Sequence, residues 1–394
     1  MTENFSQEFP HCLVFTEFGL FLGKHSERLI VKKAKETIAE YPLLDLEQVI
    51  IAAPGISLSS DLVAACMRRG IAIVMTDYAG RPYAHITSPA LHATVRTRRA
   101  QLMAYNEPRG VEIARRFAMG KIQNQINLLR YFGKYRKRRG HESYAHIEGL
   151  ITQLEALLQT LPHIEGAGIE AVRDAFLNVE GRAASLYWQG VCLLLPPQLF
   201  PGRVHQGAAD PVNALLNYGY GILYSQVWNV LLLAGLEPFA GFLHADRPGK
   251  PSLVLDFIEE FRQPIVDRTV IALFNKGFVV EWETPDAEQR AEKHVKADTG
   301  GPRKSPEFLG QGTPSPLEEE GASPENTDET PSQQMRLSAD TRRALAAKIF
   351  ERLEDTEPFE GKRRKLRHIL QIQARHLATF LRGEGDYKPY IARW

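Results

Sequence analysis

The residue pattern changes near Thr94, and this change limits what the chain can fold into. Before it, residues 11–87 hold short apolar runs bounded by turn residues, a pattern typical of β-strands. Within them, SLSSDLVAACMRRG predicts a helix that is capped by Ser59 or Ser60 and ended by Gly70. After Thr94, apolar residues recur at the three-to-four spacing of α-helices. We therefore predict an α+β chain with a small N-terminal β-rich domain and a large all-helical domain. A Rossmann unit is the alternative for the first part, although no glycine fingerprint follows a strand there.

Composition divides the 394 residues further. Residues 285–335 are rich in Pro, Gly, Ser, Thr and acidic residues and contain almost no apolar ones. Such a segment cannot bury enough surface to offset its ordering entropy, so we predict a flexible acidic insertion. Helical periodicity returns in TRRALAAKIFERLED. The predicted domains are therefore the β-rich domain, 1–90, and the helical domain, 91–284, which the helices of 336–394 complete.

Charge and cysteine content narrow the class of protein. The net charge is +1, so any nucleic-acid surface must be local. Cys12, Cys66 and Cys192 lie among apolar neighbours without the spacing of metal or redox pairs, which predicts reduced thiols and a cytoplasmic protein. The N-terminus lacks the pattern of a secretory signal. The longest apolar run, Val227 to Leu236, is too short to span a bilayer, and no membrane association is expected.

The residues from 241 to 267 have the composition of a metal site. His244 lies in a short loop, and the helix predicted after it carries Asp256, Glu259 and Glu260 at i, i+3 and i+4. We predict that the three acids share one face, which looks into a cleft. A separate apolar stripe would seat the helix on the core: Leu253, Phe257 and Phe261. Histidine and carboxylates suit Mn²⁺, Mg²⁺ or Zn²⁺. Alternatively, the acids form a solvated face and the histidine has no role.

Glu180 lies in a predicted helix, IEAVRDAFLNVEGRAASLYWQ, whose apolar stripe begins with Ile169 and Val172. Glu180 falls close to that stripe. Phe176 lies four residues before it and Ala184 four after, so the carboxylate points along an otherwise apolar face. An unpaired ionised carboxylate there would cost several kcal/mol. Glu180 therefore needs a cation, which is either a metal ion or a basic side chain in a tertiary salt bridge.

Basic residues gather in two groups within the helical part. The first is Arg96, Arg98 and Arg99, and the second, interleaved with aromatic residues, is Lys134, Arg136, Lys137, Arg138 and Arg139. Basic side chains neutralise phosphates and aromatic rings stack on bases, so we predict nucleic-acid surfaces. A basic amphipathic helix from Lys362 is a third candidate. The alternative for the second group is a solvated helix end whose cations match the helix dipole.

A further helix is predicted to start at Asp210, its cap, with Pro211 in the first turn. It carries a polar strip beside apolar faces, made of Asn213, Asn217 and Tyr224. The strip fits a wall of an active cleft, or it holds ordinary hydrogen-bonded core residues.

Four motifs occur in a fixed order along the chain. They are VEGRAASLYW around Glu180, DPVNALLNYGYG from Asp210, GFLH with R-x-G-x-P and LDFIEEFR, and Tyr-x-Pro-Tyr before Arg-Trp. Together they resemble the CRISPR-associated adaptation integrases of the Cas1 family, over nearly the whole chain. The acidic insertion departs from the compact family pattern. The resemblance implies a metal-dependent DNA endonuclease and integrase that inserts short DNA fragments into a CRISPR array with Mg²⁺ or Mn²⁺.

The resemblance also implies partners and site residues. It implies a homodimer that assembles with a small Cas2 partner protein, the N-terminal domain serving dimerisation or docking and the helical domain catalysis. The metal ligands would be Glu180, His244 and Glu259, with Asp256 as a supporting catalytic acid. Asn213 and Tyr218 would be second-tier cleft residues. Arg247 and Lys250 would contact DNA, in addition to the two basic groups. Two rival functions stay open, a metal hydrolase of a small substrate and a non-catalytic DNA scaffold.

Overall fold

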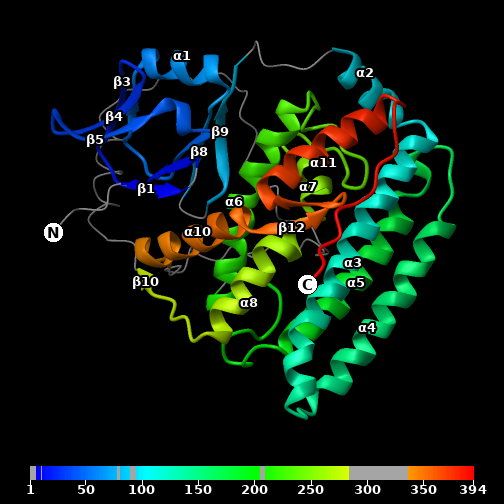
Figure 1. Cartoon of the computed structure of the whole chain (residues 1–394). Helices are drawn as coiled ribbons and strands as arrows, with labels where there is room; N and C mark the ends of the chain where they lie inside the picture. Colours follow the sequence, from blue (N-terminus) through cyan, green and yellow to red (C-terminus); the bar gives the residue numbers. More distant parts are fainter. Residues whose placement is uncertain (1–5, 10, 78–79, 89–94, 205–208, 284–335) are drawn as a thin grey trace, which may run out of the picture.

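The computed structural model describes residues 6–9, 11–77, 80–88, 95–204, 209–283 and 336–394. Its N-terminal part consists of two sheets and helix α1 (Ser60–Arg69) (Figure 1). The strands are β1 (Ser6–Phe9), β2 (Cys12–Phe15), β3 (Phe21–His25), β4 (Arg28–Lys33), β5 (Glu36–Pro42), β6 (Gln48–Ile51), β7 (Ser57–Leu58), β8 (Ala72–Thr76) and β9 (Pro82–Ile86).

The two sheets differ in their pairing. The first has the order β1-β2-β6-β8-β9, with β2, β6 and β8 parallel and an antiparallel strand at each edge. The second has the order β5-β4-β3-β7. The Ser59 hydroxyl accepts a hydrogen bond from the Leu62 N–H at 3.2 Å, and Gly70, with φ of 74°, ends α1. The predicted cap and the predicted end of this helix are therefore confirmed. A doubly wound Rossmann unit needs several helices on its sheet, whereas the described residues of this part form one α-helix, so the Rossmann alternative is wrong.

The rest of the described chain is mostly helical, so the predicted fold class is confirmed. Its α-helices are α2 (Val95–Ala104), α3 (Pro108–Arg138), α4 (Ser143–Thr160), α5 (Arg173–Cys192), α6 (Pro211–Leu233), α7 (Ser252–Ile258), α8 (Arg268–Asn275), α10 (Ala339–Glu354) and α11 (Leu366–Leu381). Shorter elements are three 3₁₀ turns (Leu43–Asp45, Leu161–His163 and Ile169–Ala171), a π-helix (Arg262–Asp267), and the strands β10 (Trp282–Glu283), β11 (Arg336–Leu337), β12 (Thr356–Phe359) and β13 (Lys362–Lys365).

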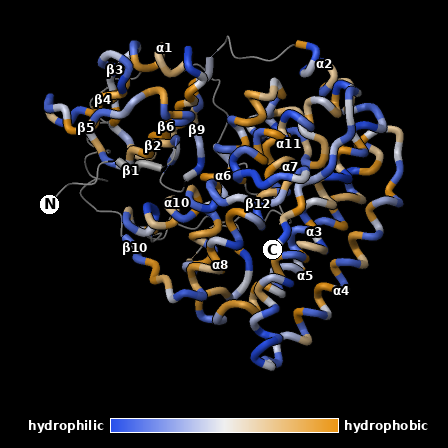
Figure 2. Tube along the Cα trace, viewed as in Figure 1, coloured by the Kyte–Doolittle hydropathy of each residue, from blue (hydrophilic) through white to orange (hydrophobic). Residues whose placement is uncertain are grey.

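Helix α6 lies at the centre of the molecule. It packs against α7, the π-helix, α10 and α11, and it also contacts β9 of the N-terminal part. Helices α3, α4 and α5 pack on one another on the side of the molecule away from the N-terminal sheets. Hydrophobic and hydrophilic residues alternate along α4 (Figure 2). Helix α3 contacts α5 and also α7 and the π-helix, so it connects α5 to the elements that follow α6.

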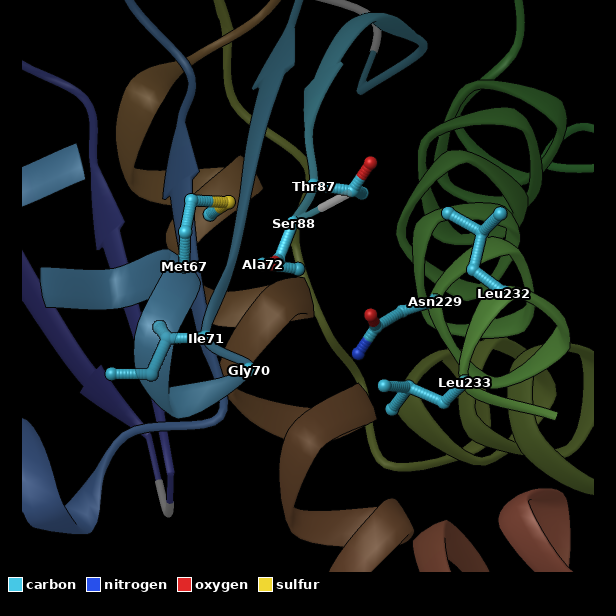
Figure 3. A pocket seen from close by; sticks show the side chains of 9 residues that line it. All are labelled: Met67, Gly70, Ile71, Ala72, Thr87, Ser88, Asn229, Leu232 and Leu233. Atoms are coloured by element: carbon cyan, nitrogen blue, oxygen red, sulfur yellow. The ribbon is translucent and has the colours of Figure 1, made fainter. Parts of the chain in front are cut away.

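The contact between α6 and the N-terminal part is close. A Cβ on Gly221 would lie 2.5 Å from the Gly80 carbonyl oxygen, so only glycine fits there. His85 stacks on Trp228, with ring centroids 4.6 Å apart. A small pocket of about 20 Å³ lies between the two parts. Figure 3 shows Asn229 of α6 on one side of it and residues of α1 and β8 on the other.

Two predicted helices start later than the sequence pattern suggested. Ile169 and Val172 lie before α5, in and after a 3₁₀ turn, although both are buried. The predicted helix from Lys362 begins at Leu366, because Lys362–Lys365 pairs instead with Thr356–Phe359 in an antiparallel hairpin.

Several other predictions have partial outcomes. The predicted insertion at 285–335 and the domain boundary at residue 90 lie outside the described residues, so the domain division stays a prediction. The three cysteines are free, Cys12 and Cys66 are buried, and Cys192 is half-buried. Among the described helices, none has the length and apolar character needed to cross a membrane.

Candidate metal centre

Three side chains from distant parts of the sequence meet in the helical part. Glu180 comes from α5, His244 from the loop between α6 and α7, and Glu259 directly follows α7. Each contributes one ligand atom, and these atoms all lie within 4.8 Å of one another. The three residues are buried, with exposed fractions of 2%, 8% and 0%. We call this set the triad.

Local sequence explains the position of Glu180. Phe176, Val179, Ala183 and Tyr187 form the buried face of α5, and Glu180 lies on that face. Its carboxylate therefore points into the core, where the predicted need for a cation applies.

Asp256 determines the position of His244. Its Oδ2 accepts the N–H groups of Phe242 at 2.6 Å and Leu243 at 2.9 Å, and its Oδ1 accepts the His244 N–H at 2.9 Å. The same Oδ1 lies 2.7 Å from His244 Nδ1, so the proton on Nδ1 is held and Nε2 is left as the ligand atom. A Cβ on Gly241 would lie 2.8 Å from Asp256 Oδ2, which explains the glycine in GFLH.

The charges around His244 change its proton affinity. Burial by itself lowers the pKa of the imidazole, whereas the hydrogen bond and the charge of Asp256 raise it. The charges of Glu180 and Glu259 act in the same direction, so the pKa of His244 lies above its ordinary value. Asp256 is therefore a positioning residue that acts through His244.

Asp256, Glu259 and Glu260 do not share one face, which corrects the prediction from their spacing: Asp256 and Glu259 lie at His244, and Glu260 does not. Helix α7 ends at Ile258, and Glu259 and Glu260 lie in the turn between α7 and the π-helix. Glu259 points toward Glu180 and His244. Glu260 instead accepts hydrogen bonds from the Tyr387 hydroxyl at 2.7 Å and the Tyr390 N–H at 2.7 Å. Burial raises the pKa of Glu260 to about 8. Glu260 thus holds the C-terminal segment and is not part of the triad.

The surroundings of Glu259 fit a divalent cation. Both carboxylate oxygens are buried and accept no hydrogen bond from the part of the chain that the structure describes. Their nearest charged partners are Lys121, with Nζ 3.0 Å from Oε2, and Arg262, with Nη1 3.0 Å from Oε1. One imidazole nitrogen and two carboxylates are also the donors that Mg²⁺, Mn²⁺ and Zn²⁺ accept. The triad therefore has the ligand chemistry of a metal site.

Lys121 and Arg262 were missed by the sequence reasoning. Lys121 Nζ also donates a hydrogen bond to Glu180 Oε1, so the tertiary salt bridge that was one alternative for Glu180 is confirmed, and a metal ion at Glu180 stays a prediction. A usable signal existed, because Lys121 follows Phe117 by four residues and precedes Leu128 by seven, on the buried face of α3. A lysine at such a position requires an acidic partner.

Asn213 and Tyr218 both make contacts in the core, and their predicted role as second-tier cleft residues stays a prediction. The Asn213 side chain accepts hydrogen bonds from Arg203 at 2.8 Å and the Val204 N–H at 3.0 Å, and it donates to Asp210 at 2.7 Å. It therefore fixes the loop before α6. Tyr218 packs against Gly80 and lines a pocket between the N-terminal sheet and α10. Interior polar residues of α6 were ambiguous in sequence because a hydrogen-bonded core residue and a cleft residue have the same spacing.

The first basic group lies on α2. Arg96 is exposed and pairs with Glu384 at 2.9 Å, Arg98 lies 3.9 Å from Glu237, and Arg99 is exposed. Helix α2 packs on α11, so this group borders the C-terminal part of the chain.

The second basic group lies at the end of α3. Lys134 is 13 positions after Lys121 on this helix, which puts it about 20 Å from the triad at 1.5 Å per residue. Arg138 and Arg139 are exposed at the tip. Lys137 lies over the Tyr144 ring at 5.2 Å, and Arg136 donates to the Leu194 carbonyl at 3.2 Å. Arg247 and Lys250 lie nearer, in the His244 loop, where their backbones form a β-bridge and Arg247 is exposed.

Comparisons with known proteins relate this fold and site to others. The family model described as "CRISPR associated protein Cas1" matches residues 13–295. The "CRISPR-associated endonuclease Cas1 1" of Archaeoglobus fulgidus is 30% identical over 389 residues, which are 97% of this chain and 99% of that protein. A solved casposase bound to its integration product has a TM-score of 0.70 at 21% identity and covers 96% of this chain and 92% of its own. A chain of a Cas6-RT-Cas1–Cas2 complex has a TM-score of 0.69 at 21% identity and covers 98% of this chain and 36% of its own. At these identities, the two structures show a shared fold.

Proposed function

The chain belongs to the Cas1 family of CRISPR-associated proteins, and we propose that it is a metal-dependent DNA endonuclease and integrase with Glu180, His244 and Glu259 as ligands. The single observation that carries this proposal is the meeting of the three buried side chains within 4.8 Å. The proposed metal is Mg²⁺ or Mn²⁺, since carboxylate-rich sites of this kind favour these ions. The proposed reaction inserts short DNA fragments into a CRISPR array by attack of a 3′-hydroxyl on a phosphodiester.

The chain's own residues prepare this reaction. A bound divalent ion would lower the pKa of the attacking hydroxyl and neutralise charge on the phosphate. Asp256 keeps the Nδ1 proton in place and so presents the Nε2 lone pair of His244. The burial of the triad excludes bulk water, which strengthens each electrostatic contact there. Water in place of the hydroxyl gives hydrolysis, so both activities use one site.

The proposed substrate is DNA, held by phosphate contacts outside the triad. Arg247 lies in the same loop as His244 and is exposed, which suits a phosphate next to the reacting one. Arg99, Arg138 and Arg139 are also exposed and offer contacts farther away. A reaction on the cell's own array places the protein in the cytoplasm.

The proposed assembly is a homodimer that binds a small Cas2 partner. By its name, the Cas6-RT-Cas1–Cas2 complex combines a chain of this fold with Cas2. The N-terminal part exposes large apolar side chains, with exposed fractions of 71% for Phe18, 91% for Leu44 and 66% for Tyr83. Exposed apolar side chains are typical of docking surfaces, which supports a role of this part in dimerisation or partner docking.

An integration assay with a purified repeat array, a short duplex and Mn²⁺, with and without the small partner, tests the proposal. We expect His244→Ala and Glu180→Ala to abolish strand transfer while DNA binding persists. His146→Ala and Glu148→Ala are matched controls, because both residues are exposed on α4. Strand transfer that survives in both site variants would refute the assignment. DNA binding without metal-dependent chemistry in the unaltered protein would favour a scaffold, and the absence of salt-sensitive DNA binding would favour a hydrolase of a small substrate.

A further inference from the structure

Lys121 is a buried cation that contacts two members of the triad. It lies on α3 with a side-chain exposed fraction of 4%. Its ammonium donates a hydrogen bond to Glu180 and lies 3.0 Å from Glu259 Oε2. One ammonium therefore joins two of the three ligands, which come from different elements.

Opposite charges contact these two carboxylates. Two carboxylates, Glu180 and Glu259, face two cations, Lys121 and Arg262. Two buried carboxylates without these cations would repel each other and would lack the hydration that stabilises them in water. The ion pairs therefore hold the acids together in the fold without any divalent ion.

Arg262 differs from Lys121 in its other contacts. Its guanidinium lies over the Tyr220 ring at 5.0 Å and is fixed on the side of Glu259 away from Lys121, at the other carboxylate oxygen. Lys121 contacts both Glu180 and Glu259, and so bridges two different elements of the fold. A divalent ion held by the same two carboxylates must share their lone pairs with this ammonium.

We propose that Lys121 acts as a resident cation that a divalent ion displaces from Glu180 and Glu259. This inference rests on the proposed function and deepens it, because it assigns a positioning role to a residue outside the ligand set. Lys121 keeps the two carboxylates at ligand distance before the metal arrives. Its ammonium also competes with the metal, so it sets a lower affinity than the ligands alone would give.

Replacement of Lys121 by methionine tests the proposal, because methionine has a similar length and no charge. In the absence of metal, we expect Lys121→Met to melt at a lower temperature than the unaltered protein, since two buried carboxylates lose a shared cation. We expect Mn²⁺ to bind this variant at least tenfold more tightly, and to raise its melting temperature by more than it raises that of the unaltered protein. Calorimetric titration with Mn²⁺ and thermal melts measure both effects without any DNA.

A matched control and a second measurement keep the test decisive. Lys276→Met makes the same change at an exposed position directly after α8 and should alter neither quantity. If Lys121→Met does not fold without metal, its helical circular dichroism signal is measured during a Mn²⁺ titration in place of the melt. Recovery of that signal supports the proposal, and failure to recover overturns it. Unchanged or weaker Mn²⁺ binding by a folded Lys121→Met would show that the lysine is only structural. Absence of Mn²⁺ binding by the unaltered protein would refute the metal centre itself. Mn²⁺ binding without strand transfer by the unaltered protein would contradict the proposed function and leave the role of Lys121 unaffected.

Discussion

Replacement of Asp256 by asparagine should weaken both the fold and metal binding. The carboxylate accepts four hydrogen bonds, at 2.6, 2.9, 2.9 and 2.7 Å, from three consecutive backbone N–H groups and His244 Nδ1. Asparagine keeps one oxygen and presents an NH₂ group in place of the other. Two of the four contacts are therefore lost, and two donors then face the NH₂ group.

The magnitude follows from the type of bond lost. Each hydrogen bond to a charged acceptor contributes about 1.5–3 kcal/mol, so the loss is about 3–6 kcal/mol of unfolding free energy. This is a large part of the 5–15 kcal/mol that is usual for a folded protein. Metal affinity should fall about 10- to 100-fold, as is typical when the partner of a ligating histidine is removed, because the imidazole loses its fixed tautomer and orientation.

Urea unfolding and calorimetric Mn²⁺ titration of the same preparation measure the two effects. Asp246→Asn is a matched control, because Asp246 lies in the same loop and accepts one hydrogen bond, from the Ser252 hydroxyl at 2.6 Å, that asparagine still accepts. It should change stability by less than about 1 kcal/mol. Unaltered Mn²⁺ affinity in Asp256→Asn would show that Asp256 does not position His244.

Three further predictions concern residues away from the triad. Burial lowers the pKa of His85 to about 4, so the folded state binds fewer protons than the unfolded state, and stability should fall as the pH decreases from about 6.5 to 4. His85→Phe should remove about 2 kcal/mol of that loss when urea unfolding at pH 7 and pH 4.5 is compared. Gly221→Ala should destabilise the protein by about 1–3 kcal/mol, because its Cβ would lie 2.5 Å from the Gly80 oxygen. Asn124→Ala should cost about 3 kcal/mol and expose the C-terminal segment to proteases, because Asn124 makes three hydrogen bonds of 2.9 Å to the backbones of Glu260, Tyr390 and Ala392.

Each of these predictions has its own control. Equal pH dependence in His85→Phe and the unaltered protein would mean that His85 does not titrate as stated. Gly149→Ala, on an open position of α4, should be neutral or stabilising, and an equal effect of both glycine changes would contradict the close contact. Asn127→Ala removes one bond to the C-terminal segment, so proteolysis should be slower than in Asn124→Ala.

The sequence by itself determined the features that depend on neighbours along the chain. The strand-to-helix change near Thr94, the caps at Ser59 and Asp210, and the buried face that carries Glu180 all followed from local spacing. Such features are fixed by backbone geometry and by which side chains avoid water, and both are properties of a short segment.

Only the tertiary structure decided which groups face one another. The spacing of Asp256, Glu259 and Glu260 predicted one shared face, but packing ends α7 at Ile258 and turns Glu259 and Glu260 in different directions. Lys121 reaches Glu180 across 59 positions of sequence. The periodicity of the sequence predicts that a charged side chain is buried, and a buried charge needs a partner of opposite charge. Which residue is that partner depends on how the helices pack, because the partner lies on another element. The opposing cations, and with them the balance between ion pair and metal site, are for this reason properties of the fold.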